Sequence, residues 1–368
     1  MTTMHSNSAN GLERALEARY YTDPDLFERE KSRIFYRTWQ FAGHISQLEK
    51  PGDYFTFEIC GQNLFVLCGS DGDVRCFYNV CMHRAHELVR GTGSAKVIVC
   101  PYHAWTYELD GRLRRAPNQS QVDGFDATTI CLTEVKTEIF CGFIFVNLDP
   151  DAAPMAEWFP DVEDQLRAYV PDIDRLKTIK VNEVEERCNW KVAVENYSEC
   201  YHCALCHPTF SKGVVDPKNY NIMPQGHCLR HTTVAANLDR LTYPVDPDAN
   251  EHATDYSSWF LWPMFSFQVY PGNVLNTYWW RPQGVGATSM YRGWHTKDGV
   301  PSEAIAQLAQ QDLDTTVAED IVLVESVQRG LSSLGYRPGP LVIDRDFGVN
   351  SEHSIRALKH WTLEALEG

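Results

Sequence analysis

A stretch of fourteen residues, ENYSECYHCALCHP at positions 195–208, is dense in side chains that bind metal ions. It contains two histidines, two glutamates, and three cysteines at C-x-x-C-x-x-C spacing. If the cysteines are the ligands, the segment holds a zinc ion or three corners of a cubane iron–sulfur cluster. If Glu199, His202 and His207 are the ligands, the metal they suit is non-haem iron.

The cysteine interpretation has the weaker support. A cubane motif of this kind needs a fourth cysteine, commonly three residues further on and followed by proline, whereas the next one here is Cys228. A thiolate set also leaves the histidines and a glutamate unexplained. We therefore interpret Cys200, Cys203 and Cys206 as packing thiols. The chain has twelve cysteines, and for a protein of a reducing compartment we expect thiols or metal ligands rather than disulfides.

The histidines fit a helix end. In NWKVAVENYSECYH the apolar positions repeat at helical spacing, which predicts a helix with Glu195, Glu199 and His202 on one face. Pro208 should stop this helix and leave His207 in the terminal turn, where its ring can converge with that of His202. Two imidazoles and one carboxylate with open positions suit Fe(II) that must bind O2.

Spacing alone does not identify the carboxylate. Glu199 is close enough in sequence, but as an i−3 neighbour of His202 it could instead orient that ring. The other candidates lie in the predicted helix TVAEDIVLVESVQRGL, which contains Glu319, Asp320 and Glu325. The residues leave these alternatives open.

A second constellation lies earlier in the chain: Cys81-x-His83, sixteen intervening residues, and Cys100-x-x-His103. Zinc fingers usually group their cysteines together and their histidines together, whereas here each arm supplies one of each. This arrangement favours a Rieske [2Fe–2S] cluster, in which two thiolates bind one iron and two imidazoles the other. Ala85 occupies a loop position that usually carries glycine.

The elements around these motifs indicate two folded domains. The 368 residues are 43% hydrophobic, and the formal net charge of −16 argues against nucleic acid as a partner. The region from Gly52 to about Leu148 has short apolar runs with Asp71-Gly72 and Asp110-Gly111 turns, which predicts an antiparallel β domain. Helical patterns occur before it, at 23–40, and after it, most clearly at 302–333. No run is apolar enough to span a membrane, and the polar N-terminus has no secretory signal, so we expect a cytoplasmic protein.

Taken together, these motifs resemble those of the oxygenase (α) component of Rieske non-haem iron oxygenases. The pattern C-x-H…C-x-x-H followed by NWK…EN-x3-E-x-x-H-x4-H occurs in the family's order and separation. Two further segments are similar to the carnitine and glycine-betaine monooxygenase group. One is ECYHC, with four residues between its own histidine and the next one, and the other is EDxxLVESVQRGL, which is followed by an SEH segment.

The resemblance implies a fold and a set of site residues. The fold is α+β, with an N-terminal helical segment (1–40), an antiparallel β Rieske domain (41–150), and a helix-grip catalytic domain (151–368). The cluster ligands are Cys81, His83, Cys100 and His103. The ligands of a mononuclear Fe(II) are His202, His207 and Asp320. Glu199 takes the family's bridging position between a cluster and the iron of a neighbouring subunit, which makes a homotrimer the expected assembly.

The resemblance also implies an activity. A two-component monooxygenase of this group hydroxylates a carbon next to nitrogen in a quaternary ammonium or N-methylated substrate, and the product falls apart into an aldehyde and a smaller amine. The chain has no G-x-G-x-x-G after a strand and no plant-type C-x4-C-x2-C, so a separate flavin- or ferredoxin-type reductase is implied. The alternative on the same scaffold is an aromatic-ring dioxygenase or O-demethylase. Ten aromatic residues in 256–281 either pack the core or form a box for a quaternary ammonium.

Overall fold

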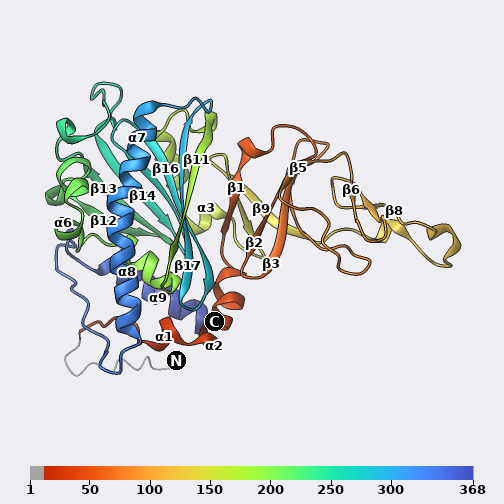
Figure 1. Ribbon diagram of the computed structural model, residues 1–368, viewed down its shortest axis with the longest axis horizontal. Coiled ribbons are helices and arrows are strands. Elements are labelled where there is room, and N and C mark those ends of the chain that lie inside the picture. Colours follow the sequence, from red (N-terminus) through yellow and green to blue (C-terminus); the bar gives the residue numbers. More distant parts are fainter. Residues whose placement is uncertain (1–11, 368) are drawn as a thin grey trace. The chain divides into compact units, whose positions relative to one another are not determined.

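The computed structural model describes residues 12–367, which form two compact units. The smaller unit is Phe35–Met155. The larger unit combines the described residues up to Ile34 with those from Ala156 onward. Each unit is built on an antiparallel sheet, and helices accompany the sheet of the larger one (Figure 1). The predicted α+β class is confirmed.

The smaller unit contains two sheets. The larger of them has the strand order β1-β10-β9-β4-β3-β2-β5, and the second has the order β6-β7-β8. The strands are β1 (Gln40–His44), β2 (Asp53–Ile59), β3 (Gln62–Cys68), β4 (Val74–Tyr78), β5 (Thr92–Ser94), β6 (Ile98–Val99), β7 (Thr106–Tyr107), β8 (Leu113–Arg115), β9 (Glu134–Phe140) and β10 (Phe143–Asn147). One cysteine–histidine arm follows β4 and the other connects β6 with β7.

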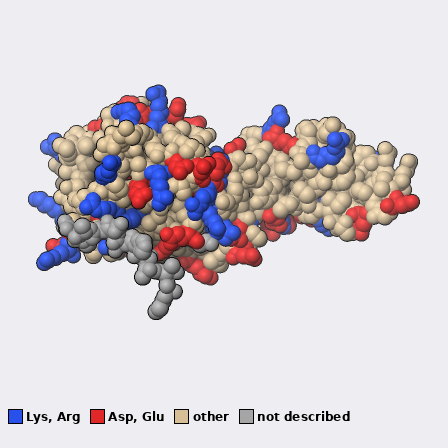
Figure 2. All heavy atoms as spheres, turned by 90° about the horizontal axis from the view of Figure 1, so that it is seen from below, with Lys and Arg blue, Asp and Glu red and all other residues tan. Residues whose placement is uncertain are grey.

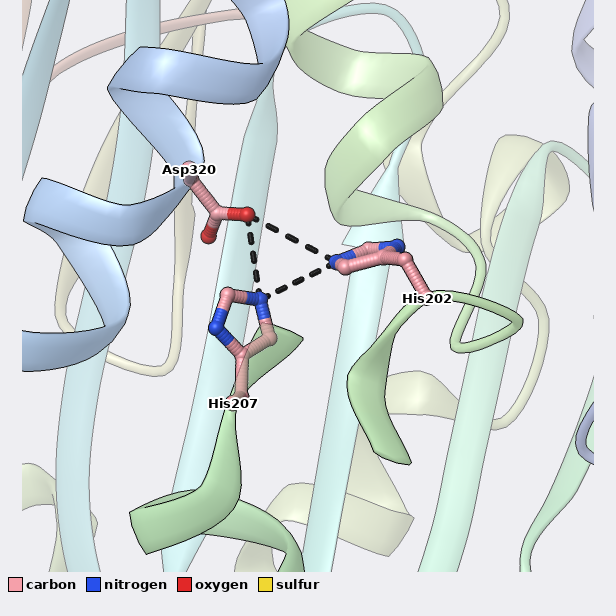
Figure 3. Close-up of side chains that lie close together, drawn as sticks. All are labelled: His202, His207 and Asp320. Atoms are coloured by element: carbon pink, nitrogen blue, oxygen red, sulfur yellow. Dashed lines mark hydrogen bonds and ion pairs between the residues drawn. The ribbon is translucent and has the colours of Figure 1, made fainter. Parts of the chain in front are cut away.

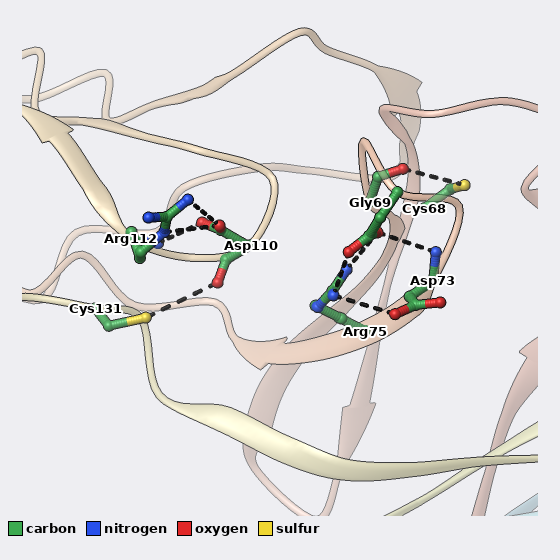
Figure 4. Close-up of polar contacts among 8 residues, drawn as sticks. Cys68, Gly69, Asp73, Arg75, Asp110, Arg112 and Cys131 are labelled. Carbon is green, nitrogen blue, oxygen red and sulfur yellow. Dashed lines mark hydrogen bonds and ion pairs between the residues drawn. The ribbon is translucent and has the colours of Figure 1, made fainter.

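Both predicted Asp-Gly turns are confirmed as hairpin connections, the first between β3 and β4 and the second between β7 and β8. Gly72 and Gly111 have φ of 91° and 86°, a backbone region that glycine enters without steric cost. Each aspartate side chain accepts from an arginine just beyond its turn, Asp71 from Arg75 and Asp110 from Arg112, and Figure 4 shows the surroundings of both turns.

The larger unit is built on a seven-stranded antiparallel sheet of order β11-β17-β16-β15-β14-β13-β12. Its strands are β11 (Leu176–Glu186), β12 (Asn221–Gln225), β13 (Cys228–Val234), β14 (Asp255–Leu261), β15 (Phe265–Tyr270), β16 (Val274–Gly284) and β17 (Ala287–Lys297). The chain's α-helices are α1 (Arg19–Thr22), α2 (Pro24–Glu30), α3 (Met155–Trp158), α4 (Val162–Tyr169), α5 (Trp190–Tyr197), α6 (Cys203–Cys206), α7 (Glu303–Asp312), α8 (Ala318–Leu331) and α9 (His353–Glu367).

Helices α5 and α8 bring the histidines of segment 195–208 and the carboxylate of Asp320 to this sheet. Helix α5 contacts β16, β17 and α8, and α8 lies across the strands of the sheet (Figure 1). A π-helical turn at Leu313–Val317 joins α7 to α8, which confirms the predicted helical stretch at 302–333. Such turns inside helices often occur at functional sites. This one ends just before Glu319 and Asp320.

The N-terminal helices are anchored in the larger unit by buried polar groups. Pro24 begins α2, and the Asp23 side chain caps it by accepting from the Asp25 N–H. The predicted helical stretch at 23–40 is only partly correct, because a π-helical turn at Lys31–Phe35 follows α2 and Gln40 already begins β1. At the other end, the Glu30 carboxylate pairs with the Lys191 ammonium and accepts from the Trp190 indole N–H. Both members of the ion pair are almost inaccessible, with side-chain exposures of 1% and 2%.

The chain's surface carries both signs of charge. Acidic and basic side chains are interspersed over the face that Figure 2 shows, so the net charge of −16 is not gathered into one acidic surface there. Within residues 12–367, the helices are too short or too polar for any of them to cross a membrane.

Candidate metal centres

The segment 195–208 does not form the single helix that the sequence predicts. Helix α5 ends at Tyr197, so Glu199 and His202 do not lie on it, and Pro208 follows the short helix α6 instead of stopping a long one. The cause is local. The Glu199 carboxylate accepts a hydrogen bond from the backbone N–H of Tyr201, and such side-chain bonds compete with helix continuation.

The prediction that the cysteines of this segment are all thiols is wrong. Cys200 and Cys203 form a disulfide across the turn, whereas Cys206 is free. The turn places the two Cα atoms 4.9 Å apart, well inside the range that a disulfide can bridge. His202 lies between the bonded cysteines in sequence, so the cross-link encloses one of the predicted iron ligands.

His202, His207 and Asp320 nevertheless converge, as Figure 3 shows. The two Nε2 atoms are 3.0 Å apart. Asp320 Oδ1 lies 3.1 Å from Nε2 of His207 and 3.5 Å from Nε2 of His202. Donor atoms about 2.1 Å from one ion and at right angles to each other lie about 3.0 Å apart. The spacing therefore fits three neighbouring positions around a single metal ion.

The protonation of the rings supports the same conclusion. The Nδ1 atom of His202 is 2.5 Å from Glu199 Oε1, and the Nδ1 atom of His207 is 2.8 Å from Glu319 Oε2. Because a carboxylate only accepts, both rings carry a proton on Nδ1, and their Nε2 lone pairs face each other. Asp320 Oδ1, which faces both lone pairs, is buried without a hydrogen-bond partner. A metal ion satisfies all three donors.

The local charge also favours a cation. Burial disfavours protonation of His202, but the attraction of Asp320 and Glu199 outweighs it and raises the pKa of His202 to about 10. The same negative groups attract a metal cation, which takes the place of a proton at Nε2. Burial acts against ionisation of Asp320 as well, yet its interactions with His202 and His207 lower the pKa of Asp320.

The cysteine–histidine arms at 81–83 and 100–103 form a pair of matching loops in the smaller unit. In each loop the cysteine N–H donates to the carbonyl five residues on, and the N–H four residues on donates back to the cysteine carbonyl. The residues four positions after Cys81 and Cys100 are Ala85 and Ala104, with φ of 57° and 54°. Ala85 thus adopts the glycine-like conformation suspected from its position, and Ala104 shares it.

These loops gather the ligands by type. The Cys81 and Cys100 thiols interact with each other, and both side chains are buried. The imidazole rings of His83 and His103 lie 4.7 Å apart between centroids, and His103 Nδ1 is buried without a hydrogen-bond partner. Two thiols on one side and two imidazoles on the other fit a Rieske cluster.

Comparison with known proteins agrees with both sites. Residues 38–126 match the family model described as "Rieske [2Fe-2S] domain", and residues 173–368 match "Ring hydroxylating alpha subunit (catalytic domain)". The chain is 35% identical over 344 residues to the carnitine monooxygenase oxygenase subunit of Acinetobacter pittii, covering 93% of this chain and 92% of that protein. The chain belongs to the Rieske non-haem iron oxygenases.

Other relatives extend this comparison. The chloroplastic choline monooxygenase of Beta vulgaris is 29% identical, over 94% of this chain and 76% of its own. A solved quaternary ammonium Rieske monooxygenase superposes with a TM-score of 0.87 at 32% identity, covering 97% of this chain and 96% of that one. This Rieske oxygenase is therefore an oxidoreductase with a [2Fe–2S] cluster and a mononuclear iron, and as an oxygenase component it implies a separate reductase.

A cavity of about 50 Å³ adjoins the three convergent side chains of this Rieske oxygenase. Part of the aromatic-rich segment 256–281 lines it and part packs the core, because side chains alternate along a strand. Tyr256, Tyr270 and Tyr278 face the cavity, whereas Trp259 and Phe267 are fully buried elsewhere. The lining contains six aromatic residues: Tyr197, Phe210, Tyr220, Tyr256, Tyr270 and Tyr278.

Two residues at these sites were missed or misassigned from the sequence. The Tyr107 hydroxyl lies 3.2 Å from Cys81 Sγ and accepts from the Met82 N–H, although nothing in its spacing indicates such a contact. The sequence indicates Glu319 only as a possible metal ligand. It contacts the far nitrogen of His207 instead.

Proposed function

We propose that this Rieske oxygenase hydroxylates a carbon bonded to nitrogen in a quaternary ammonium or N-methylated substrate of the carnitine or betaine type. The observation that carries the proposal is the aromatic-lined cavity beside His202, His207 and Asp320. Aromatic rings bind quaternary ammonium groups through the negative face of the ring. The named activities of the relatives, carnitine and choline monooxygenases, support the same substrate class.

The residues of the two sites have separate tasks in this proposal. Cys81, His83, Cys100 and His103 hold the cluster, and His202, His207 and Asp320 hold the iron, which when bound supply electrons and the activation of O2. Glu199 orients His202 through Nδ1 and serves as the bridge toward the cluster of a neighbouring subunit. Its side chain is 14% exposed, so it remains accessible from outside the fold.

The overall reaction takes up O2, two electrons and two protons. One oxygen atom enters a C–H bond of the substrate and the other leaves as water. The product carries a hydroxyl on the carbon next to nitrogen. Loss of the hydroxyl proton with cleavage of the C–N bond gives an aldehyde and a smaller amine. The protein's part is to hold the substrate carbon near the iron and to keep bulk water away.

The proposal includes an assembly and a partner. The chain forms a homotrimer, in which the cluster of one subunit serves the iron of the next. A flavin- or ferredoxin-type reductase of the same compartment, the cytoplasm, supplies electrons from NAD(P)H.

Metal analysis tests the site assignments. The purified chain should contain about three irons, two with acid-labile sulfide and one without. His83→Ala should remove the cluster and leave the mononuclear site able to bind metal. Asp320→Ala should deplete the mononuclear iron while the Rieske absorption persists. Retained iron and activity in the Asp320 variant would move the ligand to Glu199 or Glu319.

Product analysis tests the reaction. The dithionite-reduced protein, freed of excess reductant, is mixed with O2 and one candidate substrate, and the products of a single turnover are identified by mass spectrometry. Carnitine, choline or a betaine should yield an aldehyde and an amine. Turnover of aromatic acids or ethers alone would instead establish an aromatic-ring dioxygenase or O-demethylase.

A further inference from the structure

The cavity beside the proposed iron site has a chemical character that distinguishes among quaternary ammonium compounds. These compounds share a cationic head and differ in the group at the other end: a carboxylate in betaines and carnitine, a hydroxyl in choline. The residues that line the cavity decide which of these ends is stabilised after its water has been removed.

The lining offers a carboxylate no cationic partner. Among the described residues that line the cavity there is no lysine or arginine, and Glu199 and Asp320 are acids. The two histidines are the proposed iron ligands. A substrate carboxylate placed here loses its hydration without gaining a charged partner, and it lies close to negative groups.

The buried Arg292 does not supply a cationic partner for a substrate carboxylate either. The Arg292 guanidinium lies behind the wall, 3.8 Å from the centre of the Tyr278 ring. Its Nε and Nη2 donate to the two oxygens of Asp312 at 2.7 and 3.0 Å, and its Nη1 donates to Asn276. Asp312 neutralises its charge, and each of its three nitrogens donates a hydrogen bond within the protein.

The cavity does offer an acceptor to a hydroxyl. Gln268, on β15, lines it and is buried, and its Nε2 donates to the Tyr256 hydroxyl at 2.8 Å. The other end of this amide, Oε1, is buried without a hydrogen-bond partner. A buried acceptor without a donor is costly, and a ligand that supplies an O–H removes that cost.

We propose that the substrate of this oxygenase is a small quaternary ammonium alcohol of the choline type, whose cationic head lies among the tyrosine rings and whose hydroxyl donates to Gln268 Oε1. The assignment rests on the proposed oxidation of a quaternary ammonium substrate, which supplies the cationic head, and it replaces the carnitine or betaine type with an alcohol. The small size of the cavity favours a short substrate as well.

Equilibrium binding to the iron-loaded protein without O2 tests the assignment with five probes. Choline carries a cation and a hydroxyl, tetramethylammonium only the cation, glycine betaine a cation and a carboxylate, carnitine all three groups, and 3,3-dimethylbutan-1-ol is the uncharged analogue of choline. Choline should bind about tenfold more tightly than tetramethylammonium and the uncharged analogue, because each lacks one contact. Glycine betaine and carnitine should bind more weakly than choline.

A substitution identifies the acceptor. Gln268→Met keeps the length of the side chain but removes the acceptor, so it should weaken choline binding about tenfold and leave tetramethylammonium binding unchanged. Gln165→Met, in a glutamine whose Oε1 accepts from Trp259 outside the cavity, is the matched control and should change neither. If Gln268→Met does not fold, the five-probe comparison decides on its own.

The outcomes distinguish a failure of the alcohol assignment from a failure of the proposed function. Glycine betaine or carnitine binding at least as tightly as choline would overturn the alcohol assignment and leave the proposed function intact. An unchanged ratio of choline to tetramethylammonium affinity in Gln268→Met would overturn the role of Gln268. Binding of the uncharged analogue as tightly as choline, with no binding of any cation above it, would overturn the proposed function itself.

Discussion

At the scale of single residues, the candidate iron site shows what spacing can and cannot decide. The sequence places Glu319 and Asp320 side by side, so it cannot say which one meets the histidines. The structure separates them by direction. Asp320 faces Nε2 of both rings, whereas Glu319 approaches His207 from behind, at Nδ1. Each histidine therefore has its own carboxylate behind it, Glu199 for His202 and Glu319 for His207.

This pairing predicts the effect of Glu319→Gln. An amide is a poorer acceptor for Nδ1–H, so His207 should be less well oriented and a weaker donor to the metal. We expect Fe(II) affinity at the mononuclear site to fall by about 10- to 100-fold. Anaerobic equilibrium dialysis measures the affinity, and the electron paramagnetic resonance spectrum of the nitrosyl complex reports the ligand geometry. Glu303→Gln, at an exposed position of α7, is the control. An affinity and spectrum equal to those of the control would remove Glu319 from the site.

A second prediction at this scale concerns Tyr107, whose hydroxyl lies beside Cys81 Sγ. A hydrogen bond to a ligand sulfur stabilises the more negative, reduced cluster and raises its reduction potential. Tyr107→Phe should lower the potential by about 40 mV, the equivalent of about 1 kcal/mol for one electron. Potentiometric titration followed by absorbance measures it. Tyr102→Phe, a ring that contacts His103 and not the sulfur, should leave the potential nearly unchanged. Equal shifts in the two variants would count against the Tyr107 contact.

At the scale of elements, the sequence predicted regular segments well and the break between them badly. The hairpins, the start of α2 and the α7–α8 stretch follow from turn residues and apolar periodicity that act within a few positions. The end of α5 depends on the Glu199 side chain bonding to the Tyr201 backbone and on the Cys200–Cys203 cross-link. Periodicity does not record such bonds, so the apolar pattern continued past the true helix end.

The buried pair of Glu30 and Lys191 ties α2 to α5 and gives a prediction for that contact. Glu30→Ala leaves a buried ammonium without its partner and should destabilise the larger unit by about 3–5 kcal/mol. Replacing both residues by methionine should recover most of this loss. Urea unfolding followed by tryptophan fluorescence measures the change. Glu28→Ala, which removes a surface ion pair on the same helix, should cost at most about 1 kcal/mol. A loss no larger than that for Glu30→Ala would mean that α2 is held by apolar contacts alone.

At the scale of the whole molecule, the two metal motifs could be found in the sequence because each lies in one or two short segments. The cavity could not be found in that way. Its wall takes Tyr256 from β14, Gln268 and Tyr270 from β15, and Tyr278 from β16, so its shape depends on the register of three paired strands. The aromatic count of segment 256–281 was visible, but which rings line the cavity was decided by the sheet.

The proposed transfer between subunits yields a prediction that only the assembled molecule can answer. His83→Ala chains keep an intact iron site and lose the cluster, whereas Glu199→Gln chains keep the cluster and lose the bridge. Each parent should be nearly inactive. In a closed ring of three, a mixed trimer contains one pairing in which an intact cluster faces an intact iron site with its own Glu199, so about one third of wild-type activity should return.

Differently tagged chains, co-expressed and purified through both tags, provide these mixed trimers, and mass photometry verifies their composition. Mixed trimers of His83→Ala with Asp320→Ala chains are the control, because they test transfer between subunits without changing Glu199. Activity in the control alone would mean that Glu199 acts from the chain that donates electrons. Absence of activity in both mixtures would place transfer within one chain and would overturn the role of Glu199 as a bridge between subunits.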